Sequence, residues 1–272
     1  MRDAADSRRR DRYRRRLEPP SPAVQTIVDD LVRTGASITS LDALALGSTA
    51  AMLQASDDVI VRVRERGAPT PDGRKSSYLI EADAGDIEAH PDLLAWGLDP
   101  ALLRAAELYF GAPVAYRGLT FRRDLADGQQ IETRLWHIDG EDRRILKVIV
   151  YLNDVNEDNG PFEYVPRDKV PRGAPHALDN GRILDDEMER FVPRPAWKAC
   201  TGKRGTAVLV DTHAVYHRGR VPRADRFALF FAYNSNRPVK PSHCQALFDR
   251  DRFAAMRPEL SAFQRAAITY SY

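Results

Sequence analysis

The chain has 272 residues, 43% hydrophobic and 29% charged, a composition typical of a globular protein with one large or two small domains. Its 41 basic residues nearly balance its 39 acidic ones, so the net charge indicates no class of partner. No stretch approaches the roughly 18 consecutive apolar residues of a membrane span. The two cysteines, Cys200 and Cys244, form neither a metal-binding pair nor a disulfide framework, so we expect a cytoplasmic protein without a membrane partner.

The first 22 residues differ from the rest of the chain. Residues 1–22 carry eight arginines against four acidic residues and few apolar side chains. Such a segment buries too little apolar surface to offset the entropy lost on ordering, so we expect a disordered basic arm. A solvated leader is favoured over an arm that binds nucleic acid, because charge runs are usually solvated. We expect residues 23–272 to form a single domain.

The predicted elements change in character along the chain. Apolar residues at helical spacing predict helices over residues 24–34, 41–55 and 100–110. Continuous or alternating apolar residues predict strands over residues 36–39, 59–63, 114–121, 131–136, 145–152, 206–210 and 227–233. Helices followed by many short strands indicate a mainly β sandwich or barrel core with flanking α-helices. Residues 167–204 show no clear period and are interpreted as a lid-like insertion.

One pair of residues has the spacing of metal ligands. His137 and Asp139 follow the predicted strand 131–136, and residues two apart in an extended segment point to the same side. A second histidine would complete a facial triad of two imidazoles and one carboxylate, which suits non-haem Fe(II). His217, after the strand 206–210, is the best candidate. The alternative is that the pair occurs by chance on the surface.

An arginine follows at a suggestive position. Arg226 lies nine residues after His217, at the start of the last apolar strand. Its planar, permanently charged fork matches a carboxylate, as a keto-diacid cosubstrate would require. The alternative is a surface ion pair with Asp225 or Asp211.

These residues lie in segments that resemble a known family. The segments are RLWHID (134–139), VIVYLNDV (148–155), NGPFEYVP (159–166), GTAVLVDTHAVYHRG (205–219) and RFALFFAY (226–233). They are similar to the phytanoyl-CoA dioxygenase family of Fe(II)/2-oxoglutarate oxygenases. The resemblance implies a double-stranded β-helix, the jelly-roll or cupin-like core. It also implies iron held by His137, Asp139 and His217, and 2-oxoglutarate held by Arg226. His213 is the competing ligand, but the family pattern favours His217.

The resemblance implies an Fe(II)- and 2-oxoglutarate-dependent dioxygenase that uses O₂ and releases succinate and CO₂. We expect it to hydroxylate an unactivated C–H bond of a small molecule, a specialised metabolite or an amino-acid derivative. The alternatives are a cupin-like metal-dependent isomerase or hydrolase, and a catalytically idle binding protein. Thr133 and Lys147 are candidates for a second 2-oxoglutarate contact, although either is equally an ordinary strand residue. The candidate substrate contacts, each of which could instead be structural, are Arg134, Trp136, Tyr151 and Phe162.

Overall fold

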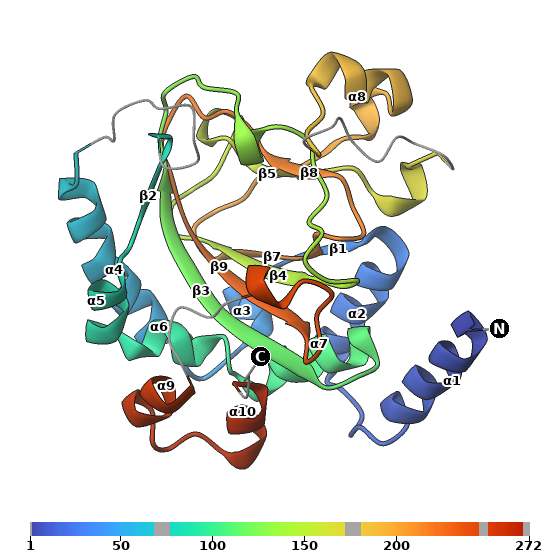
Figure 1. Cartoon of the computed structure of the whole chain (residues 1–272). Coiled ribbons are helices and arrows are strands. Elements are labelled where there is room, and N and C mark those ends of the chain that lie inside the picture. The colour runs from blue at the N-terminus through green and yellow to red at the C-terminus, as the bar shows by residue number, and fades with distance from the viewer. Residues whose placement is uncertain (1, 68–76, 172–180, 245–249, 269–272) are drawn as a thin grey trace.

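The fold is built around two antiparallel β-sheets that face each other (Figure 1). The structure is a computed structural model that describes residues 2–67, 77–171, 181–244 and 250–268. Within these residues the larger sheet has the order β1-β7-β4-β9-β3-β2, and the smaller has the order β6-β5-β8. The strands are β1 (Ala36–Ser40), β2 (Leu79–Glu81), β3 (Val114–Asp124), β4 (Leu146–Tyr151), β5 (Phe162–Tyr164), β6 (Lys198–Cys200), β7 (Thr206–Asp211), β8 (His217–Gly219) and β9 (Arg226–Ser235).

The path of the chain between the sheets is that of a double-stranded β-helix, or jelly roll. After β4 in the larger sheet the chain enters the smaller sheet for β5 and β6 and returns to the larger sheet for β7. It then crosses to the smaller sheet for β8 and comes back to the larger sheet for β9. Strands that are neighbours in space are therefore distant in sequence, as when β3 pairs with β9. The predicted mainly β fold with flanking helices is confirmed.

Alternation along the strands gives the larger sheet two different faces. On β4, Leu146, Val148 and Val150 belong to the main apolar cluster, which also contains the buried residues of the helices. Ile149 and Tyr151 point the opposite way, into a second cluster between the sheets. The candidate site lies on this inner side.

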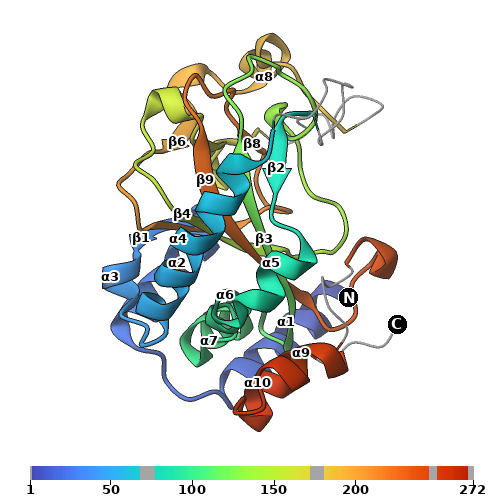
Figure 2. The same ribbon diagram turned by 90° about the vertical axis from the view of Figure 1, so that its left-hand side faces the viewer.

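Helices cover the outer face of the larger sheet (Figures 1 and 2). They are α2 (Pro22–Thr34), α3 (Leu41–Leu44), α4 (Thr49–Glu65), α5 (Ala84–Ala89), α6 (Pro91–Trp96) and α7 (Pro100–Phe110). Further helices are α1 (Arg2–Arg14), α8 (Asp185–Phe191), α9 (Arg250–Met256) and α10 (Ala262–Ala267). The predicted helix 24–34 is confirmed as α2, which Ser21 caps at its start and Gly35, with φ of 87°, ends.

The prediction of a strand over residues 59–63 is wrong. These residues continue α4, and the predicted helix 41–55 is divided between α3 and the start of α4. Met52, Val59 and Val63 recur at helical spacing and are fully buried against the sheet. Tertiary packing of this apolar face therefore overrides the β-propensity of the valine-rich run.

The strand predicted over residues 131–136 is also largely absent. Glu132–Arg134 form the 3₁₀ helix η2, and pairing begins only at Trp136 and His137, as isolated bridges. The buried Arg134 guanidinium favours the turn, because it donates to the backbone oxygens of Gln129 and Leu125.

The expected disordered arm differs from the structure, in which residues 2–14 form helix α1. Its last turn contacts the C-terminal end of α7: Tyr13 Oη donates to Glu107, and Arg14 donates to the carbonyls of Leu108 and Tyr109. A guanidinium at the end of a helix satisfies carbonyls that have no partner within that helix. These contacts give the charged segment a tertiary role that its composition does not reveal.

The segment predicted as a lid packs on the outside of the smaller sheet. Residues 172–180 of this segment lie outside the described residues. The rest contributes α8, β6 and an antiparallel bridge between Ile183 and Trp136. Met188 of α8 and Trp197 form an apolar cluster with Trp136. The insertion therefore extends the smaller sheet beside His137.

We predict that Phe231→Ala lowers the free energy of unfolding by about 3–5 kcal/mol, because it leaves a cavity in the main cluster. Phe231 is fully buried, with its ring centroid 4.7 Å from that of Trp96. Urea unfolding measures the loss. Val61→Ala is the control, because Val61 is 55% exposed and should change stability little. Equal effects of the two variants would contradict the packing described here.

Candidate metal centre

Three side chains from distant parts of the chain converge between the sheets. His137 follows η2, and its backbone forms two hydrogen bonds with that of His217 at the start of β8. The Asp139 amide donates to the Thr212 carbonyl. This backbone pairing brings a potential ligand atom of each of His137, Asp139 and His217 within 4.8 Å of the others.

The two imidazoles turn the same nitrogen toward the carboxylate. Each Nε2 lies 3.7 Å from an oxygen of Asp139, Oδ1 for His137 and Oδ2 for His217. Each Nδ1 faces a carbonyl oxygen, that of Leu135 at 2.8 Å and that of Val215 at 3.2 Å. A carbonyl only accepts, so Nδ1 carries the proton and Nε2 presents a lone pair.

The electrostatics keep all three groups in the protonation state that a metal requires. Burial, assisted by the neighbouring His217, lowers the pKa of His137. Burial also lowers the pKa of His217 to about 4. Burial opposes ionisation of Asp139, but Lys147 and the two histidines hold the pKa of this carboxyl well below its usual range. At neutral pH the group is two neutral imidazoles and a carboxylate, which is the donor set of a metal site.

Lys147 orients the carboxylate. Its Nζ lies 2.5 Å from Asp139 Oδ2. Lys147 is on β4, opposite Val210 of β7 and Ala232 of β9. From the sequence, Lys147 is predicted to contact the cosubstrate. In the structure its ammonium instead contacts Asp139, a candidate metal ligand.

His213, the competing ligand, lies outside the triad. Its Nδ1 is 2.9 Å from the backbone oxygen of Asp139. The structure brings together His217 with His137 and Asp139, as the sequence predicted.

Arg226 belongs to a buried group of charges on the inner face. It is 1% exposed, and its Nη2 lies 2.8 Å from Asp124 Oδ2, directly across from it on β3. Its Nη1 donates to the carbonyl of Gly160. The alternative of an ion pair with Asp225 or Asp211 is wrong, because those carboxylates bind Arg123 and Tyr109.

A second arginine shares the same carboxylate. Arg122 Nε lies 3.4 Å from Asp124 Oδ2, and its guanidinium is 3.6 Å from the centroid of Phe230. Burial opposes ionisation of Asp124, but Arg226 and then Arg122 lower the pKa of its carboxyl. Glu81, opposite Arg122 on β2, is exposed. The buried Arg226 and the largely buried Arg122 therefore share Asp124, and Glu81 adds a further negative charge near Arg122. Sequence reasoning missed Arg122 and Asp124, whose signal was a run of three charged residues, 122–124, at the end of a mostly apolar strand.

Two other predicted site residues are held by structural contacts. The Thr133 hydroxyl is 2.8 Å from the Tyr78 hydroxyl, which also accepts from the Thr133 amide. Arg134 forms an ion pair with Asp127 and stacks over the ring of Tyr78. These contacts account for both side chains without a ligand.

The predicted aromatic contacts lie on opposite sides of the smaller sheet. Trp136 packs edge to face against Trp197, under α8. Phe162 instead stacks on His217, with ring centroids 5.6 Å apart. The Tyr151 hydroxyl donates to the Cys200 carbonyl and accepts from the Phe162 amide. Phe162 and Tyr151 therefore line the interior, whereas Trp136 does not.

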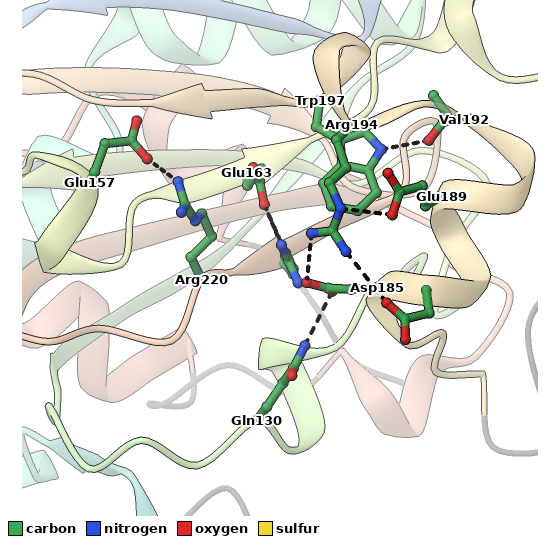
Figure 3. Close-up of polar contacts among 11 residues, drawn as sticks. Gln130, Glu157, Glu163, Asp185, Glu189, Val192, Arg194, Trp197 and Arg220 are labelled. Carbon is green, nitrogen blue, oxygen red and sulfur yellow. Dashed lines mark hydrogen bonds and ion pairs between the residues drawn. The ribbon is translucent and has the colours of Figure 1, made fainter.

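The neighbour of the second histidine ties the insertion to the smaller sheet. Arg218 pairs with Glu163 of β5 and with Asp185 of α8, and it stacks over Trp136. Figure 3 shows this network, in which Gln130 and Arg194 also reach Asp185. The ion pairs join α8 to the strand that carries His217.

No protein-family model matches the chain, and no curated protein matches it. Solved structures do. One is the epimerase SnoN in complex with Fe³⁺, alpha ketoglutarate and nogalamycin RO, with a TM-score of 0.54, 16% identity, and 79% of this chain and 84% of that chain covered. Another is EctD from S. alaskensis with 2-oxoglutarate and 5-hydroxyectoine, with a TM-score of 0.52, 20% identity, and 80% and 79% covered. The non-heme monooxygenase ThoJ gives a TM-score of 0.52 at 17% identity, with 79% of each chain covered.

At these identities the likeness shows the fold, and it agrees with the jelly-roll topology. Fold and site together define a jelly-roll protein whose described residues hold a potential metal-binding triad between the sheets. The resemblance to phytanoyl-CoA dioxygenases stays a prediction, since no family model matches. Among the described helices, none has the length and apolar character needed to cross a membrane.

We predict that Asp124→Asn destabilises the protein at pH 7 by about 3–5 kcal/mol, because it leaves two buried arginines without their shared anion. The pKa of Asp124 in the folded chain lies below the ordinary value of 3.8 for an aspartate. Its stabilisation is therefore present above about pH 4 and is lost as the pH falls through the lowered pKa. Urea unfolding at several pH values should show the two proteins converging in acid.

Asp225→Asn is the control, because its partner Arg123 is partly exposed, and it should cost about 1 kcal/mol or less. If the difference in free energy of unfolding between Asp124→Asn and the unmodified chain does not change with pH, Asp124 is not ionised in the folded protein.

Proposed function

We propose that the chain is an Fe(II)- and 2-oxoglutarate-dependent dioxygenase that hydroxylates an unactivated C–H bond of a small molecule, with release of succinate and CO₂. The observation that carries this proposal is the convergence of His137, Asp139 and His217 within 4.8 Å. Two imidazoles and one carboxylate on one side of a metal leave the opposite positions open, whereas a structural zinc site uses four protein ligands.

The buried arginines support a dianionic cosubstrate. Arg226 and Arg122 lie close together around the buried carboxylate of Asp124, and two neighbouring guanidinium groups could also bind a carboxylate of the cosubstrate. Arg226 reaches toward the smaller sheet, where a Cβ atom at Gly219 would lie 3.2 Å from its Nη2. Gly219 and His217 are two residues apart on β8 and face the same side. The far carboxylate of 2-oxoglutarate could thus bind Arg226 while its keto acid end reaches the triad.

Bound iron and 2-oxoglutarate would supply oxidative decarboxylation coupled to oxidation of a substrate C–H bond. Lys147 holds Asp139 in its ionised form and fixes its orientation. Phe162, stacked on His217, covers one side of the site and excludes water. Of the two residues predicted as a second cosubstrate contact, we keep Lys147, because its ammonium lies at the triad.

The neighbours support the choice of cofactors and leave several reaction outcomes. SnoN binds Fe³⁺ and alpha ketoglutarate and is described as an epimerase, and ThoJ is described as a monooxygenase. Epimerisation and hydroxylation are different reactions that the same two cofactors could support, and of these we propose hydroxylation. We further propose that residues 23–272 act as one domain and that residues 167–204 cover the site.

We predict that His137→Ala and Asp139→Ala abolish formation of succinate from 2-oxoglutarate and weaken Fe(II) binding by at least about tenfold, because each removes a ligand. Anaerobic titration with Fe(II) and 2-oxoglutarate, followed by absorption, measures binding, and succinate is measured after adding O₂. His90→Ala is the matched control, since His90 lies at the end of α5. Full activity of either triad variant would overturn the assignment.

We predict that Arg226→Gln weakens 2-oxoglutarate binding by about 10–100-fold, since a hydrogen bond to a charged group contributes about 1.5–3 kcal/mol. Arg226→Lys keeps the positive charge but loses the planar guanidinium. Its affinity for 2-oxoglutarate should therefore lie between that of the unmodified chain and that of Arg226→Gln. The control is Arg123→Gln, whose side chain binds Asp225 instead. An unchanged affinity in folded Arg226→Gln would exclude Arg226 as the carboxylate partner.

A further inference from the structure

A polar cavity of about 270 Å³ lies beside the triad and is not explained by the metal or the cosubstrate. Its floor is formed by Phe230 and Ala232 of β9, and its polar lining includes Arg117, Glu141 and Asn234. This volume is slightly smaller than the range of about 300–1,000 Å³ that is typical of ligand pockets. A small molecule would fit, and a large one would have to extend outside.

The cavity adjoins the metal centre. Ala232 is paired with Lys147, whose Nζ is 2.5 Å from Asp139. Glu141 follows Asp139 by two residues. Along the inner face of β9, Arg226 lies on one side of Ala232 and Asn234 lies on the other. Asn234 lies toward the end of β9 that is far from Arg226, so the polar end of the cavity and the proposed cosubstrate carboxylate are separated along this inner face.

The lining carries groups for both signs of charge. Asn234 is 3% exposed, and its Nδ2 has no hydrogen-bond partner, which costs free energy unless a ligand supplies an acceptor. Arg117 is 7% exposed and adds a permanent positive charge to the same cavity. Glu141 is half-buried and adds a carboxylate.

We propose that this cavity binds the primary substrate as a compact zwitterion, a molecule that carries both a carboxylate and an ammonium group. The substrate carboxylate accepts from the Asn234 amide and pairs with Arg117, and its ammonium pairs with Glu141. Phe230 and Ala232 contact the carbon skeleton between the two charges. The catalytic meaning of this site rests on the proposed function, but the binding itself does not.

The test uses L-proline and two analogues of the same ring size that each lack one charge, pyrrolidine and cyclopentanecarboxylate. Ligand-observed NMR and calorimetry measure their affinity for the full chain, both metal-free and loaded anaerobically with Fe(II) and 2-oxoglutarate. We expect saturable binding of L-proline and at least about tenfold weaker binding of both analogues. Binding of either analogue as tight as that of L-proline, or no saturable binding of L-proline, overturns the proposal.

Variants locate the binding. Asn234→Leu removes the amide at similar volume, and Asn234→Asp places a negative charge against the substrate carboxylate. Both should weaken L-proline binding by about tenfold or more. Asn236→Ala is the control, because Asn236 is exposed two residues farther along. Thermal unfolding identifies any variant that fails to fold. Unchanged affinity in a folded Asn234 variant counts against the site.

The outcomes separate this inference from the proposed function. If Fe(II) and 2-oxoglutarate bind but L-proline does not, the zwitterion site is wrong and the oxygenase assignment stands. If L-proline binds with the expected selectivity but Fe(II) and 2-oxoglutarate do not, the site stands and the oxygenase assignment is wrong.

Discussion

The candidate metal site depends on keeping one largely buried carboxylate, that of Asp139, ionised. Asp139 is surrounded by the Lys147 ammonium and two imidazoles, and its pKa is low for that reason. A charge in a protein interior is tolerated only where opposite charges or hydrogen-bond donors compensate it. This requirement gives Lys147 a reason to stand on an otherwise apolar strand. It also makes the backbone pairing of His137 with His217 decisive, because that pairing sets the positions of both rings.

Successive residues on the strands of the larger sheet point to opposite faces, so one face packs against the helices and the other lines the candidate site. Outward residues of β4 and β9 join the apolar layer under the helices, and inward residues of the same strands carry the charged groups. Along the inner face of β9, Arg226 lies at one end, and Phe230, Ala232 and Asn234 line the polar cavity toward the other. Arg226 is buried and bound to Asp124 and Gly160, so its guanidinium is held in one orientation.

Sequence reasoning predicted what local patterns encode. The spacing of His137 and Asp139 and the period of α2 were both visible in the printed letters. It failed where tertiary contacts decide: the valine-rich run in α4 became helical because its apolar face packs on the sheet. Asp124 could not be found from the sequence, because its partner Arg226 is 102 residues away and meets it only through the register of β3 with β9. Trp136 was interpreted as a pocket residue for its nearness to His137, yet neighbours on an extended segment face opposite sides.

The same alternation has a mechanical consequence at the start of β8. His217 points to the triad, while Arg218 points outward and is held by Asp185 of α8 and by Glu163. Next to the other histidine, Trp136 forms an antiparallel bridge with Ile183 of the insertion. Both imidazoles are thus carried on backbone segments whose outer sides belong to the insertion. The insertion therefore supports the backbone that positions both candidate ligands, so a change in its packing would alter the geometry of the triad.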